Sequence, residues 1–178
     1  MKTIAFSGIP FQKVFLEILL GEAGLTLEDV EVRNVGHEIV PALASGDADA
    51  AFGGTGNVEG AVLEARGLEP VVTPVRDLGL PPYEDLVIAT RSGRAPPGPR
   101  LVRDFMSAVA RGTAAAVEDP REAVRLIQRS PEGDPYLGLR ATEAAVRATF
   151  PLLSRTGCMD PDQEAQLVDW MGGQGLIR

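Results

Sequence analysis

The chain has few of the residues that build metal centres, disulfides or aromatic pockets. It contains one cysteine and one histidine among 178 residues, and its aromatic content is 5%. Cys158 cannot form an internal disulfide, and we interpret it as a small buried apolar residue. No Cys/His spacing suits zinc, and no Ser/His/Asp set can be assembled. These absences argue against catalysis, a resident metal and a cofactor.

Basic clusters and long apolar runs are absent as well. The net charge is −8, and residues 1–90 carry 5 Lys/Arg against 14 Asp/Glu, whereas residues 91–178 carry 12 against 11. An acidic first half without basic clusters argues against nucleic acid and anionic membrane surfaces as partners. No stretch is long enough to span a bilayer, and the first residues lack a basic region followed by a signal-length apolar run.

The first half of the chain alternates between strand-like and helix-like patterns. Apolar runs predict strands at 3–6, 30–35, 48–52, 71–75 and 86–90, and helical spacing predicts helices at 11–19, 39–44 and 58–65. The order βαβαβαββ is typical of a mostly parallel sheet with flanking helices. We therefore predict an α/β fold for residues 1–91.

The composition changes at residues 92–99, which are rich in glycine and proline and predict a linker. Helical patterns fill residues 100–178, with helices expected to begin near residues 101, 120, 136 and 161. Asp160-Pro161 has the sequence of a helix start. The second half is thus predicted to be an all-helical tail without a sheet of its own.

The segment Asp47–Glu59 is the candidate ligand-binding region. Its strand-like run ends in the glycines of Gly53-Gly54-Thr55-Gly56, and Asn57 is a plausible N-cap for the next helix. Ligands of open α/β sheets bind at the carboxyl ends of the strands. We therefore expect the ligand-binding residues to lie along one sheet edge: Ser7, Gly8, Gly36, His37, Gly53, Gly54, Thr55, Asn57 and Glu59.

Structural interpretations of the same residues remain open. The glycine turn could be a tight strand-to-helix connection without a ligand, Glu59 a solvated helix residue and His37 an ordinary loop residue. Asp47 and Asp49 resemble a carboxylate pair, but the end of the preceding helix and the alternation of the strand explain both.

Several motifs, taken in order, resemble the solute-binding proteins of thiamine-precursor ABC transporters, whose relatives bind alkanesulfonates, riboflavin and similar solutes. The motifs are Gly8-Ile9-Pro10, Val40–Gly46, Asp49-Ala50, Gly53-Gly54, Asn57-Val58-Glu59, Pro81–Val87, Glu118–Ala123 and Asp169-Trp170. The resemblance covers nearly the whole chain. It implies a periplasmic-binding-protein-like fold that binds a solute without catalysis.

Such proteins bind their ligand between two lobes, and a stretch of roughly a hundred residues that builds most of the first lobe would precede Met1. On this resemblance, residues 1–91 are the second lobe and residues 100–178 would pack on the missing first lobe. The implied partners are a small-molecule solute, an ABC permease, and either a second copy or a complementary lobe. The location would be extracytoplasmic for a fragment of an exported protein and cytoplasmic for a complete natural chain.

The resemblance also has departures. Thiamine-pyrimidine binders usually carry bulky aromatic residues just before the asparagine that corresponds to Asn57, whereas this chain has Thr55-Gly56. Stacking on a planar heterocycle is therefore weakened, although Glu59 could still bind an amino-pyrimidine edge. Yeast pyrimidine synthases share the fold family, but their cysteine-rich motif is absent. The alternatives are a ligand-sensing domain and a protein of thiamine-pyrimidine biosynthesis.

Overall fold

In the computed structural model, the described residues are 1–84, 86–91, 98–130, 138–154 and 156–177. The chain divides into two compact units. The first combines Met1–Val72 with Arg121–Pro151, and the second combines Thr73–Pro120 with Leu152–Arg178. The predicted boundary at residues 92–99 stays a prediction, because residues 92–97 lie outside the described part of the chain.

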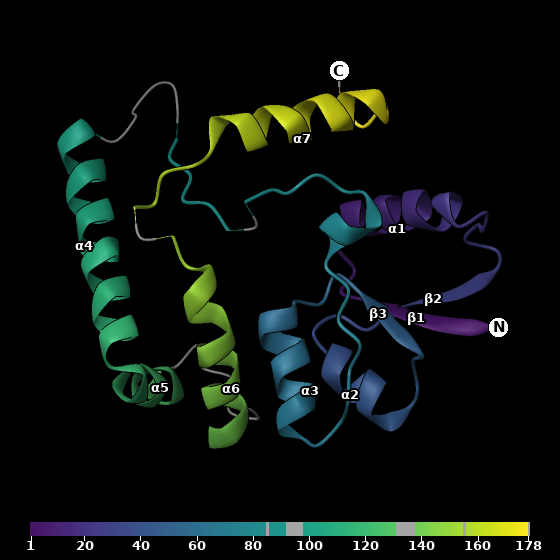
Figure 1. Ribbon diagram of the computed structural model, residues 1–178, viewed down its shortest axis with the longest axis horizontal. Helices are drawn as coiled ribbons and strands as arrows, with labels where there is room; N and C mark the ends of the chain where they lie inside the picture. Colours follow the sequence, from purple (N-terminus) through teal and green to yellow (C-terminus); the bar gives the residue numbers. More distant parts are fainter. Residues whose placement is uncertain (85, 92–97, 131–137, 155, 178) are drawn as a thin grey trace. The chain divides into compact units, whose positions relative to one another are not determined.

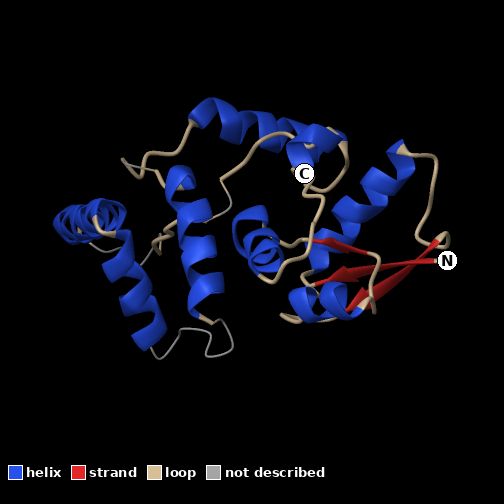
Figure 2. Ribbon diagram, turned by 60° about the horizontal axis from the view of Figure 1, so that its bottom comes forward, coloured by secondary structure: helices blue, strands red, loops and turns tan. Residues whose placement is uncertain are grey.

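The first unit contains a small parallel sheet, as the strand and helix pattern predicted (Figure 2). Its strands are β1 (Lys2–Phe6), β2 (Val30–Asn34) and β3 (Ala50–Phe52), in the order β2-β1-β3. Ala5 of β1, the central strand of the sheet, is fully buried and packs with Ala42 and Ala48. These small side chains let helix α2 (Ile39–Ser45) lie close to the sheet. The α/β class is therefore confirmed.

Helices cover both sides of this sheet. Figure 1 shows α1 (Pro10–Glu22) on one side and α2 on the other. Pro10 occupies the first turn of α1, where its missing N–H costs no hydrogen bond. Phe15, Leu16 and Leu20 form the buried stripe of this helix, at the spacing expected of a helix that covers a sheet.

A helix from much later in the sequence, α6, completes the first unit. One π-helical turn, η1 (Gly56–Gly60), leads into α3 (Ala61–Ala65), and α6 (Leu139–Thr149) packs against both (Figure 1). Val62 of α3 is 2% exposed and Val146 of α6 is 6% exposed. Helix α5 (Pro120–Arg129) lies just before the segment that leads to α6.

Two predicted strands are wrong. Residues 71–75 and 86–90 form no strand, and Val75–Leu78 is a 3-10 turn instead. Pro70 and Pro74 lack the N–H groups that a sheet ladder needs and leave only Val71–Thr73 between them. An apolar run also needs a sheet edge to pair with, yet Val71 is 94% exposed and Leu86 is 92% exposed.

The second unit contains α4 (Pro99–Glu118) and α7 (Pro161–Gly173), while η3 (Phe150–Leu152) spans the boundary between the units. The Asp160 carboxylate accepts the N–H groups of Asp162 and Gln163, so the predicted start of α7 is confirmed. The start expected near residue 136 lies outside the described residues. Within the described ranges, none of the helices combines the length and the apolar character needed to cross a membrane.

The interpretation of Cys158 as buried is wrong, because this thiol is exposed. The residue follows Gly157, whose φ is +68°, in the loop that precedes α7. Cys158 is not among the buried side chains of the described residues, so it lies at the surface and not in a core.

Candidate functional site at the carboxyl edge of the sheet

The carboxyl ends of all three strands meet at one edge of the sheet. Phe6, the last residue of β1, is paired with Asn34 of β2 and with Phe52 of β3. Because the strands are parallel, the loops that follow them start side by side. The structure therefore brings the predicted loops Ser7-Gly8, Gly36-His37 and Gly53–Thr55 to the same edge. Their role in ligand binding stays a prediction.

The loop after β1 is held against the end of β2. Gly8 has a φ of +82°, which favours glycine, and a Cβ there would lie 2.6 Å from the side-chain nitrogen of Asn34. The Asn34 side-chain oxygen accepts the N–H of Gly36 at 3.0 Å. Asn34 therefore packs against the first predicted loop and binds the second. His37 follows as an exposed residue without a hydrogen bond among the described residues.

Gln12, which the sequence analysis missed, connects the loop after β1 with the turn after β3. Its Oε1 accepts the Ser7 hydroxyl at 2.8 Å, and its Nε2 donates to the Gly53 carbonyl at 3.5 Å, the long end of the range. Gln12 is only 5% exposed. Its spacing from the buried Phe15 and Leu16 places it on the inner face of α1, which is the signal that could have identified it.

The turn between β3 and η1 is stabilised by Glu59. One carboxylate oxygen, Oε2, accepts both the backbone N–H and the hydroxyl of Thr55, each at 2.7 Å. This contact resembles one half of a capping box, in which a side chain inside the helix satisfies the N–H of the N-cap residue. Glu59 Oε1 makes no further hydrogen bond to the described residues and can accept one from a ligand.

The predicted N-cap at Asn57 is wrong. Thr55 occupies the cap position of the first turn, and Asn57 lies within η1. The Asn57 amide nitrogen instead donates to the Thr149 hydroxyl of α6 at 2.9 Å, which ties the candidate site to a helix far along the chain. Of the Asn57 amide, the side-chain oxygen remains as an acceptor.

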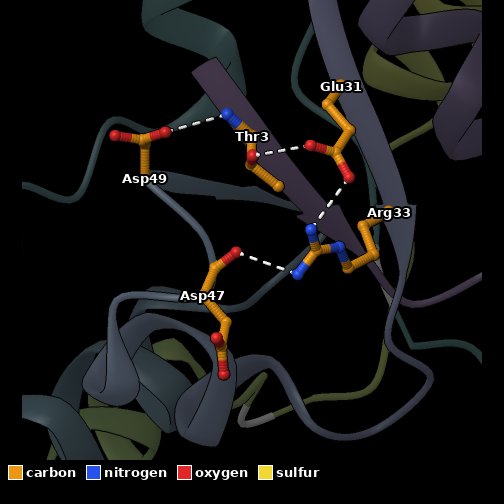
Figure 3. Close-up of polar contacts among 5 residues, drawn as sticks. All are labelled: Thr3, Glu31, Arg33, Asp47 and Asp49. Atoms are coloured by element: carbon orange, nitrogen blue, oxygen red, sulfur yellow. Dashed lines mark hydrogen bonds and ion pairs between the residues drawn. The ribbon is translucent and has the colours of Figure 1, made fainter. Parts of the chain in front are cut away.

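Asp47 and Asp49 do not form a carboxylate pair; each contacts its own partners (Figure 3). The Asp49 carboxylate accepts the Thr3 N–H at 2.8 Å and forms an ion pair with Lys2 at 2.5 Å. Asp47 offers its backbone carbonyl to Arg33 at 3.2 Å, and its carboxylate accepts the Ser45 hydroxyl at 2.6 Å. Both residues precede β3, so they lie away from the carboxyl edge.

Hydrogen bonds and charges from Lys2 and Arg33 lower the pKa values of two exposed carboxyls, Asp49 and Glu31. The Lys2 side chain, followed by the Thr3 N–H, holds the pKa of Asp49 below its ordinary value of 3.8. The hydrogen bond and charge of Arg33 lower the pKa of Glu31, which also accepts the Thr3 hydroxyl at 3.2 Å. These contacts join β1 to β2 and to the residues that precede β3, which accounts for both aspartates without a ligand. Among the described residues, no group of three or more His, Cys, Asp or Glu side chains could hold a metal ion.

The first unit is thus an α/β structure whose parallel strands end in glycine turns and polar side chains at one edge of the sheet. In open α/β sheets this is the edge at which ligands bind. Residues 2–123 match the family described as NMT1/THI5 like, and the chain belongs to that family.

Two curated proteins are similar to this chain. A formylaminopyrimidine-binding protein of Halalkalibacterium halodurans is 30% identical over 125 residues, which cover 70% of this chain and 38% of that protein. A protein of Haemophilus influenzae whose name assigns it to thiamine biosynthesis is 24% identical over 177 residues, which cover 99% of this chain and 55% of that protein. The chain thus spans about half or less of the length of these relatives.

Proposed function

We propose that this protein binds a small, planar, nitrogen-rich solute of the thiamine-precursor pyrimidine type and does so without catalysis. The observation that carries the proposal is the hydrogen bonding of Glu59 at the carboxyl edge of the sheet. Its Oε2 accepts two hydrogen bonds from Thr55, whereas its Oε1 accepts none from the described residues. A carboxylate fixed in this way is a ready acceptor for the amino hydrogens of a pyrimidine.

The family and the name of one relative support this choice of ligand. The chain belongs to the NMT1/THI5-like family, and the relative that is 30% identical is named for binding formylaminopyrimidine. We infer that the protein acts as the solute-binding component of an ABC importer and passes its ligand to a membrane permease. Lobe closure around the solute would be a hinge motion of a common kind.

A role in thiamine-pyrimidine biosynthesis is the second candidate. The Haemophilus influenzae relative, similar over 99% of this chain, carries a biosynthetic name. The two candidates differ in the fate of the ligand. A solute-binding protein releases the pyrimidine unchanged, whereas a biosynthetic enzyme consumes or produces it. Mass spectrometry of the ligand recovered after incubation with the protein separates these outcomes.

Replacing Glu59 tests the proposed binding mode directly. Thr55-Gly56 offers no ring for stacking, so we expect weak binding of an aminopyrimidine, with a dissociation constant of about 1 mM. Glu59→Gln removes a charge-assisted hydrogen bond, so the affinity should fall about ten- to a hundredfold. Titration of the ¹⁵N-labelled protein followed by NMR measures affinities in this range.

The matched control is Glu64→Gln, which neutralises an exposed carboxylate of α3 and should leave the affinity unchanged. Flavins, sulfonates and amino acids complete the ligand panel. Tight binding of any member of the panel that survives Glu59→Gln would show that Glu59 is not the anchor and would contradict this assignment.

A further inference from the structure

Gln12 is a buried polar side chain whose two ends contact two different strand ends. It lies in the first turn of α1, accepts from Ser7 after β1 and donates to Gly53 after β3. Gly53 is the residue that makes room for it, because a Cβ at Gly53 would lie 2.2 Å from the Gln12 amide nitrogen. The φ of Gly53 is +83°, a conformation that other residues rarely adopt. The amide and the glycine therefore fit each other.

The directions of these hydrogen bonds follow from their chemistry. A backbone carbonyl can only accept, so the amide nitrogen of Gln12 faces Gly53 and the amide oxygen faces Ser7. That oxygen can also only accept, so the Ser7 hydroxyl must donate its proton to it. A hydroxyl has one proton, and Ser7 Oγ is therefore left with lone pairs alone. Ser7 can meet a ligand at this edge only as an acceptor.

We propose that Gln12 is a positioning residue that fixes Ser7 as a hydrogen-bond acceptor and holds the Gly53 turn beside it. This inference rests on the proposed function, because it assigns Ser7 to the same ligand amino group as Glu59. A primary amino group has two N–H donors, and Glu59 and Ser7 each accept one of them. This pair of acceptors favours a ring that carries an amino group over a ring that carries a carbonyl oxygen in the same place.

A matched pair of ligands measures this selectivity. 4-Amino-2-methylpyrimidine offers donors where 2-methyl-4-pyrimidinone offers an acceptor, and the ratio of their affinities for the full chain is the readout. Gln12→Met retains the length of the side chain but makes no hydrogen bond, so the Ser7 hydroxyl becomes free to rotate and donate. We expect the preference for the amino ligand to fall roughly three- to tenfold.

A second background isolates the effect of Ser7. In Ser7→Ala, adding Gln12→Met should leave the ratio unchanged, because the hydroxyl that Gln12 orients is gone. Loss of packing alone would weaken both ligands equally and would leave the ratio as it is in the wild type. The selectivity ratio thus responds to the orientation of Ser7 and not to general destabilisation.

Gln12→Glu separates the two bonds and serves if Gln12→Met fails to fold. A carboxylate still accepts from Ser7 but cannot donate to the Gly53 carbonyl. This variant should keep the amino preference while the Gly53 turn loosens. Hydrogen exchange measured by mass spectrometry should rise in the segment around Gly53–Thr55, whereas Lys13→Met, an exposed neighbour on α1, should leave it unchanged.

The outcomes distinguish this inference from the proposed function. If the wild type binds the amino ligand and Gln12→Met leaves the ratio unchanged, the role of Gln12 is overturned and the proposed function stands. If the wild type binds neither pyrimidine, the proposed function and the ligand role of Ser7 both fail. Hydrogen exchange then tests whether Gln12 holds the two loops in place. If exchange around Ser7 and around Gly53 is the same in Gln12→Met as in the wild type, the positioning role is overturned as well.

Discussion

At the scale of single residues, the candidate site is defined by glycines that make room for particular side chains. Gly53 adopts a φ of +83°, and the nearest atoms to a Cβ placed there belong to the Gln12 amide, at 2.2–2.8 Å. The amide is the far end of a flexible side chain and can move. An added methyl group would therefore displace Gln12 and break its bond to Ser7 in addition to straining the backbone.

We predict that Gly53→Ala lowers the free energy of unfolding by about 1–3 kcal/mol. Gly46→Ala is the matched control, because its φ is +79° and nothing lies within 4 Å of a Cβ there. This control has the backbone strain without the steric contact, so it should lose less stability. Urea unfolding measures both changes.

The difference between the two glycine variants should disappear when Gly53→Ala is made in a Gln12→Ala background, because no amide is left to displace. If Gly53→Ala costs no more than Gly46→Ala in the wild-type background, the Gly53 carbonyl and Gln12 are not coupled. The inference about Gln12 would then lose its structural basis.

At the scale of secondary-structure elements, the sheet is joined by exposed charges that titrate in acid. The Asp49 carboxylate binds the Thr3 N–H, next to the backbone bond from Asp49 N–H to the Thr3 carbonyl at 2.9 Å, and so helps to pair β1 with the start of β3. Its pKa in the folded protein is lowered, chiefly by Lys2. A lowered folded-state pKa contributes stability above the unfolded-state value, and this contribution disappears as the pH falls through the folded-state value.

We therefore expect no contribution of Asp49 to the pH dependence of stability between about pH 5 and pH 7, and a loss of stability below about pH 4. Asp49→Asn should flatten this acid limb, because the carboxylate with the lowered pKa is gone. Urea unfolding between pH 3 and pH 7 gives the slopes. An acid limb in Asp49→Asn as steep as in the wild type would contradict the assignment.

Helices could be predicted, because their pattern depends on local sequence. The strands expected at 71–75 and 86–90 could not, because a strand also needs a neighbouring strand to pair with. Apolar spacing was sufficient for α1 and α2, because each covers the sheet with one face. The segment at 71–75 is rich in valine, as β2 is, yet it forms no strand, because pairing requires a sheet edge and N–H groups that Pro70 and Pro74 lack. The β-propensity of a segment does not tell whether a strand lies beside it in the fold.

The candidate site shows the same limit. Glycines and strand ends predicted which loops share an edge. The sequence could not decide between Thr55 and Asn57 as the helix cap, since both are capping residue types and the choice depends on where Glu59 reaches. Gln12 was missed because its role arises from contacts with Ser7 and Gly53, which is 41 residues away in the sequence.

At the scale of the whole molecule, exposed apolar side chains point to association with another chain. Leu101 and Phe105 of α4 are 64% and 54% exposed, and they lie one turn apart on the same helix face. Val109, one turn further, extends this face and is 37% exposed. Contiguous apolar surface of this kind commonly marks an interface.

We predict that the chain self-associates at concentrations between about 10 and 100 µM, a range that corresponds to about 5–7 kcal/mol of binding free energy. Burial of a leucine or phenylalanine side chain is worth about 1.5–3 kcal/mol, so Leu101→Gln with Phe105→Gln should weaken the association by roughly a hundredfold or more. Arg103→Gln on the same helix changes a charge without removing apolar surface and is the control. Sedimentation velocity over a concentration series is the measurement.

A wild-type chain that stays monomeric at 100 µM would contradict the prediction, and a double variant that associates as strongly as the wild type would place the interface elsewhere.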